Sequence, residues 1–281
     1  MSCGAVLQSN KKQNSNHITE SSPHLEVHNS TPYIINLQLN IVELLSLFFC
    51  QKCSQKINII QQQTCCKKCG YPLSNDTMHS IYGAFLDTND KQCPSCHAAG
   101  NKHFFCIARS CYGYHGTIKR LIINYKFHFQ TETIDFIGLS LFYVYQQMPK
   151  ADIICFIPIT KTKLFLKGYN HAGLIANNFY QHARQTNQTL ILLPDLLLKN
   201  RVSEASKHLT QNERWRKKQN FIINNKYLAQ QWQDMMRNKT ILVIDDIMTT
   251  GATLNEAAKV IKTAFNHTKV ECLTFARTLL Y

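Results

Sequence analysis

Two adjacent carboxylates, Asp245 and Asp246, stand between an apolar run and a loop of hydroxyls in the segment ILVIDDIMTTGATL (residues 241–254). Carboxylates accept charge-assisted hydrogen bonds from hydroxyl groups, whereas the backbone N–H groups of a glycine-containing loop bind phosphate. A ribose 5-phosphate group satisfies both halves of the segment, with its phosphate in the loop and its 2- and 3-hydroxyls on the carboxylates. An ordinary strand ending in a capped turn is the alternative interpretation.

A strand and a helix must position these groups. Residues 241–244 form a short β-branched run, which is typical of a strand buried on both faces. From Leu254 onward apolar residues recur at helical spacing, so a helix is predicted to begin near Thr253. Ligands of open parallel sheets bind at the carboxyl ends of strands, and a helix N-terminus favours phosphate. The predicted phosphoribosyl-binding residues are Asp245, Asp246, Met248, Thr249, Thr250, Gly251, Ala252 and Thr253.

A second cluster of phosphate-binding side chains follows another predicted strand. The segment ADIICFIPI (151–159) is an apolar run that Pro158 interrupts. Two hydroxyls and two ammonium groups come next, and they would lie beside the first loop if the two strands are neighbours. We interpret them as pyrophosphate-binding residues or, alternatively, as a solvated turn. These residues are Thr160, Lys161, Thr162 and Lys163.

The stretch from Lys199 to Lys218 is strongly basic and contains Trp215. It is interpreted as a mobile lid over pyrophosphate, as a single-strand nucleic-acid patch in which Trp215 stacks on a base, or as a plain exposed helix. The residues of this possible lid or nucleic-acid patch are Arg201, Arg214, Trp215, Arg216, Lys217 and Lys218.

Three C-x-x-C pairs indicate a zinc site, since two residues between ligands let both sulfurs face one ion. The candidate ligands are Cys50, Cys53, Cys66, Cys69, Cys93 and Cys96. One zinc ion takes four thiolates, so 66/69 combine either with 93/96 or with 50/53, and the sequence leaves both open. A remaining pair would need a further ligand from Cys65, Cys106, His79, His97 or His103. We expect a structural zinc ion.

The composition is that of a globular protein with basic character. The chain has 281 residues, of which 44% are hydrophobic, and a formal net charge of +14. This charge favours polyanionic partners, namely phosphorylated substrates, nucleic acid or an acidic membrane surface. The apolar stretch at 33–49 is too short and too polar to span a membrane, and we expect a half-buried helix there. Without a recognisable signal peptide we expect a cytoplasmic protein whose cysteines are thiols or metal ligands.

The organisation along the chain predicts three parts. Residues 1–32 are polar and are expected to be a disordered tail, and residues 33–108 carry most of the cysteines and form the predicted zinc-binding module. In residues 109–281, helical patterns (132–148 and 170–185) alternate with strand patterns (151–159, 241–244 and 270–276). This alternation predicts an α/β fold with a parallel sheet flanked by helices.

The segment 241–254 resembles the phosphoribosyl pyrophosphate (PRPP) signature of type I phosphoribosyltransferases. The stretches YHGTIKRLIINYKF (114–127) and IPITKTKLFLKGYNHAGLIAN (157–177), together with the C-x-x-C pairs, resemble the ComF/GntX family, with Lys167, Tyr169 and His171 in place of its arginine, phenylalanine and glutamine. The resemblance implies a type I phosphoribosyltransferase-like domain behind an N-terminal zinc module. It also implies PRPP binding with Mg²⁺ and a role in DNA uptake during natural transformation, with a competence helicase and single-stranded DNA as partners.

Two functional hypotheses follow. In the first, the chain is an enzyme that transfers a phosphoribosyl group from PRPP to an unknown acceptor of nucleotide metabolism. In the second, it keeps the pocket for binding PRPP or a related nucleotide and assists DNA uptake without turnover. No general base is recognisable in the sequence, so catalysis would depend on positioning and charge neutralisation of pyrophosphate.

Overall fold

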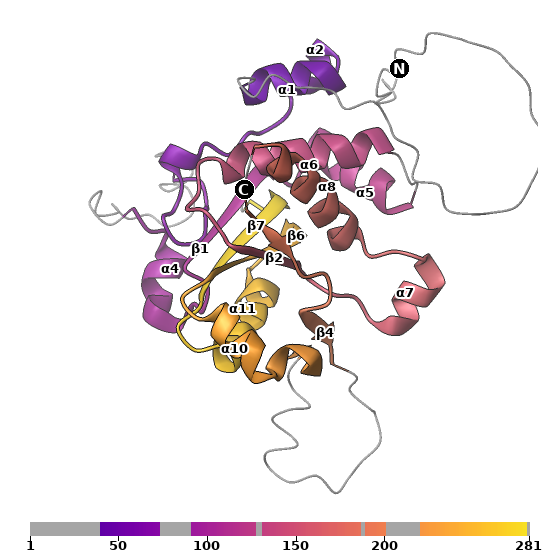
Figure 1. The fold of residues 1–281 in the computed structure, drawn as a ribbon. Coiled ribbons are helices and arrows are strands. Elements are labelled where there is room, and N and C mark those ends of the chain that lie inside the picture. Colours follow the sequence, from indigo (N-terminus) through magenta and orange to yellow (C-terminus); the bar gives the residue numbers. More distant parts are fainter. Residues whose placement is uncertain (1–39, 74–90, 128–130, 187–188, 201–219, 280–281) are drawn as a thin grey trace, which may run out of the picture.

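Five parallel strands form the centre of the protein in a computed structural model (Figure 1). The structure describes residues 40–73, 91–127, 131–186, 189–200 and 220–279. The strand order is β1-β7-β6-β2-β3, and every neighbouring pair is parallel. The strands are β1 (Ile107–Gly113), β2 (Ile153–Phe156), β3 (Ile191–Leu192), β6 (Thr240–Met248) and β7 (Lys269–Arg277). The predicted α/β fold with a parallel sheet is therefore confirmed.

Both faces of the sheet are covered, which explains the uninterrupted apolar runs of the central strands. Successive side chains of a strand point to opposite faces. Leu242 and Ile244 accordingly belong to one buried cluster, and Ile241 and Val243 belong to the other. A strand that alternated apolar and polar residues could not fill both clusters.

Four helices cover the first face: α1 (Ile41–Phe48), α5 (Gly116–Phe127), α6 (Thr131–Tyr145) and α8 (His171–Gln185). Figure 1 shows α6 and α8 running side by side over the sheet with α1 outside them. Helix α1 begins at a capping box, in which Asn40 accepts from the backbone N–H of Glu43 and Glu43 accepts from that of Asn40.

The second face carries helix α11 (Ala252–Ala264), helix α10 (Gln230–Met236) and a small antiparallel pair, β4 (Leu197–Lys199) and β5 (Phe221–Ile223). The 3₁₀ turn η3 (Asn225–Leu228) joins β5 to α10. Leu254, Ala257, Ala258 and Ile261 form the buried side of α11 against the sheet. A short helix, α7 (Lys161–Lys167), follows β2 and projects from the body of the protein (Figure 1).

The cysteine-rich part packs at the β1 edge of the sheet. It contains α2 (Gln51–Ser54), η1 (Gln62–Thr64), α4 (Pro94–Ala99) and η2 (Gly100–Lys102). Residues 58–60 run along β1, where Ile60 donates its N–H to Cys111 O and Gly113 donates its N–H to Asn58 O. Gly70 has φ +69°, and a Cβ there would lie 2.7 Å from Ala108 O, so only glycine allows this close approach to β1.

Element boundaries differ from the sequence predictions where the chain approaches the site. The strand predicted to end at Ile244 continues to Met248, because Asp245, Ile247 and Met248 still pair with β7. The strand predicted over 151–159 is limited to Ile153–Phe156. The predicted tail and the part of the expected 33–49 helix before residue 40 lie outside the described residues. None of the described helices is long and apolar enough to cross a membrane.

Candidate functional site

The topology has a switch point between β2 and β6, and the crevice expected at the carboxyl ends of these two strands is the candidate site. From β2 the chain moves outward to β3 through α8 on the first face, whereas from β6 it moves the opposite way to β7 through α11 on the second face. The two loops therefore leave adjacent strands in opposite directions at the carboxyl ends. Such a switch point is where open α/β sheets bind their ligands. It places Thr160–Lys163, after β2, beside the 249–253 loop after β6.

The loop between β6 and α11 has the geometry of a phosphate cradle. Gly251 adopts φ +81°, a left-handed conformation that glycine reaches without strain, and α11 starts at the next residue. The Thr250 hydroxyl oxygen accepts from the Ala252 N–H at 3.3 Å. The first N–H groups of an α-helix have no intrahelical acceptor, so those of α11 are directed toward this loop. Thr249, Thr250, Ala252 and Thr253 are exposed, so a phosphate can reach them.

The two carboxylates differ sharply in their surroundings. Asp245 and Asp246 both lie on β6 beyond its last residue paired with β2, near the carboxyl end of the strand. Asp246 forms an ion pair with Lys126 of α5, with Nζ and Oδ2 2.5 Å apart. Asp245 accepts a hydrogen bond from the Asp246 backbone N–H at 2.9 Å. Burial, followed by the charge of Asp246, raises the pKa of Asp245 to about 8.

Thr160–Lys163 forms the beginning of α7. The Thr160 hydroxyl oxygen accepts from the Lys163 N–H at 3.2 Å and caps the helix. Lys161, Thr162 and Lys163 are all exposed. At the other end of α7, Asn170 donates to Ile157 O at 2.9 Å and so fixes the chain against the end of β2. The two ammonium groups are therefore held near the crevice by a short loop anchored at both ends.

The β4–β5 pair contributes charge next to α11. Asn220 binds both carboxylate oxygens of Glu256, through its backbone N–H and through its side-chain amide at 2.8 Å. Lys199 places its ammonium group 4.4 Å from the centre of the Phe221 ring. Burial lowers the pKa of Lys199, and the carboxylate of Glu256 opposes that shift. The basic segment with Arg201, Arg214, Trp215, Arg216, Lys217 and Lys218 lies outside the described residues.

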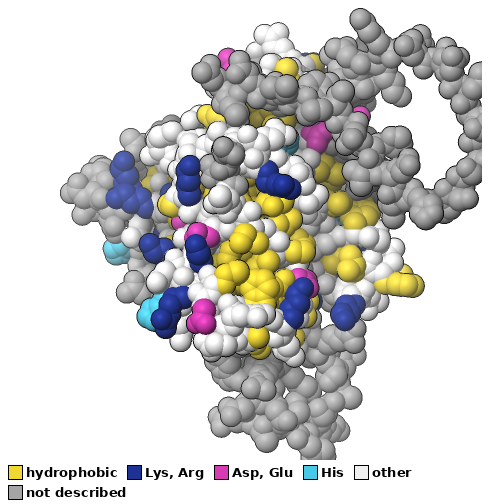
Figure 2. Space-filling view, in the orientation of Figure 1, with side chains coloured by type: hydrophobic (Ala, Val, Ile, Leu, Met, Phe, Trp, Pro, Cys, Tyr) yellow, Lys and Arg dark blue, Asp and Glu magenta, His cyan; other side chains and the backbone are white. Residues whose placement is uncertain are grey.

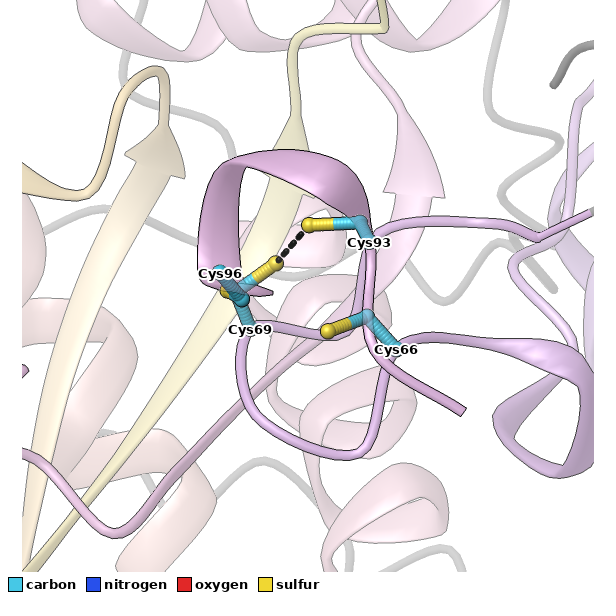
Figure 3. Close-up of side chains that lie close together, drawn as sticks. All are labelled: Cys66, Cys69, Cys93 and Cys96. Atoms are coloured by element: carbon cyan, nitrogen blue, oxygen red, sulfur yellow. Dashed lines mark hydrogen bonds between the residues drawn. The ribbon is translucent and has the colours of Figure 1, made fainter. Parts of the chain in front are cut away.

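Four buried thiols converge on one point at the β1 edge, drawn in Figure 3. The sulfurs of Cys66, Cys69, Cys93 and Cys96 all lie within 4.8 Å of one another, and those of Cys69 and Cys93 are 3.6 Å apart. Tetrahedral zinc with Zn–S bonds of about 2.3 Å requires sulfurs about 3.8 Å apart, so the group fits this ion. Hydrogen bonds within the group, the one from Cys69 first, lower the pKa of Cys66. The four residues could thus hold a metal such as zinc.

Positive and neutral donors surround this group. Arg277, buried at the end of β7, hydrogen-bonds the Cys69 carbonyl at 2.5 Å, and its guanidinium lies 4.9 Å from the Tyr71 ring centre. His103 Nε2 lies 3.6 Å from Cys96 Sγ, and burial lowers the pKa of His103. Four thiolates around Zn²⁺ would carry a net charge of −2, and the guanidinium of Arg277 would offset half of it. Such outer-shell partners orient metal ligands and tune their basicity.

The remaining cysteine pair is elsewhere. Cys53 is buried in the first-face cluster, and Cys50, at the start of α2, is exposed. Among the described residues neither belongs to the four-thiol group, and neither do Cys65, Cys106 or His97. His79 lies outside the described residues. Of the two pairings that the sequence left open, the structure therefore assembles 66/69 with 93/96.

Two functional residues escaped the sequence analysis. Lys126 pairs with Asp246, and Arg277 binds the first cysteine knuckle. Lys126 lies in the stretch 114–127 but was not singled out there, and Arg277 lies outside the quoted motifs. A weak signal exists for Arg277, which is a charged residue at the end of the apolar run 270–276. Buried charges at such positions are normally paired, so a partner could have been expected there.

The two sites share elements. Met248, at the end of β6, is in register with Arg277. Asn255, in the first turns of α11, accepts from the Phe104 N–H at 2.6 Å and donates to Lys102 O at 3.4 Å. The cysteine-rich part is therefore linked to the strand before the 249–253 loop through Arg277 and to the helix after it through Asn255.

No protein-family model matches the sequence. No curated protein matches it either. One solved structure with similarity to this chain is hypoxanthine-guanine phosphoribosyltransferase from Schistosoma mansoni in complex with IMP, at 12% sequence identity and a TM-score of 0.23. The match covers 51% of this chain and 60% of that enzyme, which is less than two thirds of its length. A similarity of this size carries no argument about function, which has to come from the site.

Proposed function

We propose that the protein binds a 5-phosphoribosyl ligand, PRPP or a related nucleotide, in the crevice between β2 and β6. The observation that supports this proposal is the switch point between β2 and β6. The two carboxylates, the glycine loop and a helix N-terminus follow one strand, and two lysines follow the other. Phosphate on the loop and hydroxyls on the carboxylates account for both kinds of group. Neither a plain phosphate site nor a plain sugar site explains them together.

The charges of the site suit a ligand that carries phosphate at two positions. The 5-phosphate occupies the Thr249–Thr253 loop, and the pyrophosphate of PRPP extends toward Lys161 and Lys163. Mg²⁺ enters with the ligand, because this ion is usually held through substrate phosphates and few protein groups. Lys126 pairs with Asp246 and orients its carboxylate before the sugar arrives. The metal of the thiol group is zinc and has a structural role, since it connects β1, β7 and the start of α11.

The proposed biological role rests on the ComF/GntX resemblance, which supports a binding protein that assists DNA uptake. On this view a competence helicase and single-stranded DNA are the partners, and the basic segment 199–218 contacts the DNA. The alternative is an active phosphoribosyltransferase that uses an acceptor of nucleotide metabolism. The motif replacements Lys167, Tyr169 and His171 favour binding without efficient turnover.

Titration of the full chain with PRPP by calorimetry, in a Mg²⁺ buffer without phosphate, tests the proposal. We expect binding in the parent and weaker binding in Thr250→Val, which loses one hydroxyl of the cradle. Thr268→Val is a matched control, because Thr268 caps the far end of α11 through a bond to Phe265 O. Absence of heat and of any melting shift with millimolar PRPP would falsify the phosphoribosyl assignment. Pyrophosphate release with a nucleobase panel separates the enzyme from the binding protein.

A further inference from the structure

Helix α7 exposes an apolar tip on a basic background. Leu164, Phe165 and Leu166 have 43%, 89% and 76% of their surface accessible. The same helix carries Lys161, Lys163 and Lys167, and all of its residues are exposed. Figure 2 shows apolar side chains standing out from the molecular outline over α7, with a cationic group close by. We propose that this tip docks the protein on anionic lipid surfaces.

The arrangement of the apolar side chains favours lipid over a protein partner. Consecutive residues of a helix point about 100° apart, so Leu164, Phe165 and Leu166 together span about 200° of the helix surface. A flat protein surface would cover only part of that arc, whereas acyl chains surround an inserted tip on every side. Apolar side chains scattered singly on a surface are ordinary, but three in succession on a projecting element are not.

The charge around the tip selects anionic headgroups. Lys163 and Lys167 lie one turn apart on the side of the helix opposite Phe165, so they can remain at headgroup level while the apolar side inserts. No acidic residue occurs between Asp152 and Asp195, so nothing in this part of the sequence cancels the lysines. The net charge of +14 adds a long-range attraction to the same surface.

The binding should be weak and reversible, because a seven-residue helix buries little apolar area. The apolar tip and the positive charge both contribute, so affinity should depend on both lipid composition and salt. Lys163 is assigned to pyrophosphate in the phosphoribosyl proposal and to headgroups here, so the two ligands would compete for it. Phe165 and Leu166 belong to the lipid inference alone, so variants at these two residues test it even if the phosphoribosyl proposal fails.

Sedimentation with vesicles tests the inference on the full chain. We expect the parent to bind vesicles with about 30% phosphatidylglycerol in phosphatidylcholine, and to bind pure phosphatidylcholine vesicles much less. Phe165→Ser with Leu166→Ser should lower the partition coefficient at least about tenfold. Val42→Ser with Leu47→Ser is the matched control, because these α1 residues are 63% and 56% exposed and lie on another part of the protein. Thermal melts establish that both double variants fold.

Fluorescence supplies the direct sign of insertion. In Phe165→Trp, emission should move to shorter wavelength on anionic vesicles, whereas Leu47→Trp should show no such change. Equal binding to neutral vesicles, no vesicle binding, or binding that survives loss of Phe165 and Leu166 would each overturn the inference. Self-association of the parent that the Phe165/Leu166 variant abolishes, without vesicle binding, would also overturn it and would assign α7 to a protein–protein contact.

Discussion

Replacing Asp245 by asparagine should stabilise the ligand-free protein while it weakens PRPP binding. Burial and the neighbouring Asp246 raise the pKa of Asp245, so the folded protein holds a proton that the unfolded chain has released. The sign follows directly: stability of the parent falls as the pH rises from about 4 toward about 8. The Asp245→Asn variant has no such group, and its stability should change less over this range.

The magnitude can be bounded from the surroundings of the carboxyl group. A shift of one pKa unit corresponds to about 1.4 kcal/mol, so full burial would make Asp245 cost about 4 kcal/mol at neutral pH. Asp245 retains some accessible surface, and the raised pKa already includes the opposing charge of Lys126. Solvent screening reduces the expected gain to about 1–2 kcal/mol. The melting temperature should rise by several degrees.

Urea unfolding of ligand-free protein at about pH 5 and about pH 8, with zinc present and phosphate absent, measures this effect. Asp152→Asn is a control of opposite sign. The Thr240 N–H and Lys239 overcome the burial of Asp152 and lower its pKa, so removing its charge should destabilise the protein at both pH values. Equal pH slopes in the parent and Asp245→Asn would refute the reasoning. If Asp245→Asn is more stable but binds PRPP as tightly as the parent, the raised pKa of Asp245 is supported and its proposed contact with the ligand is refuted.

Purified metal-replete protein should contain at least one zinc ion per chain by elemental analysis. Cys93→Ser should lose this ion, whereas Cys50→Ser should retain it, and the reverse pattern would contradict the four-thiol assignment. Gly251→Ala should weaken PRPP binding about tenfold, because alanine is strained at φ +81°, whereas Gly100→Ala, at φ +53° with open space around it, tests for a general glycine effect on affinity. The logarithm of the binding constant for single-stranded DNA should fall linearly with the logarithm of the salt concentration. Alanine at Arg214, Arg216, Lys217 and Lys218 should make that slope less steep, and an unchanged slope would exclude this segment from DNA binding.

The strand–loop–helix unit could be predicted from the sequence, because the apolar run, the glycine and the helical spacing follow one another directly between residues 241 and 265. It was insufficient for features that depend on packing between distant segments. Six cysteines at equivalent spacing cannot reveal which four meet, because that choice depends on where the β1 edge holds the knuckles. The extension of β6 through Asp245 follows from pairing with Thr274 on β7, and no pattern in the sequence around Asp245 predicts it. Lys126 reaches Asp246 only because α5 packs beside the carboxyl end of β6.

The strip of chain that runs along β1 has a consequence for solubility. A bare edge strand offers N–H and C=O groups to another molecule and seeds aggregation. Residues 58–60 occupy that edge through Ile60 and Asn58, and the knuckle at Gly70 packs against it as well. The opposite edge, β3, has only two paired residues and offers little to a neighbour. A chelator that frees the thiols would release the knuckle, whose Lys68 carbonyl accepts from the Ala108 N–H, and would expose that part of the edge. Metal loss in a cell should therefore first appear as aggregation of the protein and its degradation by proteases.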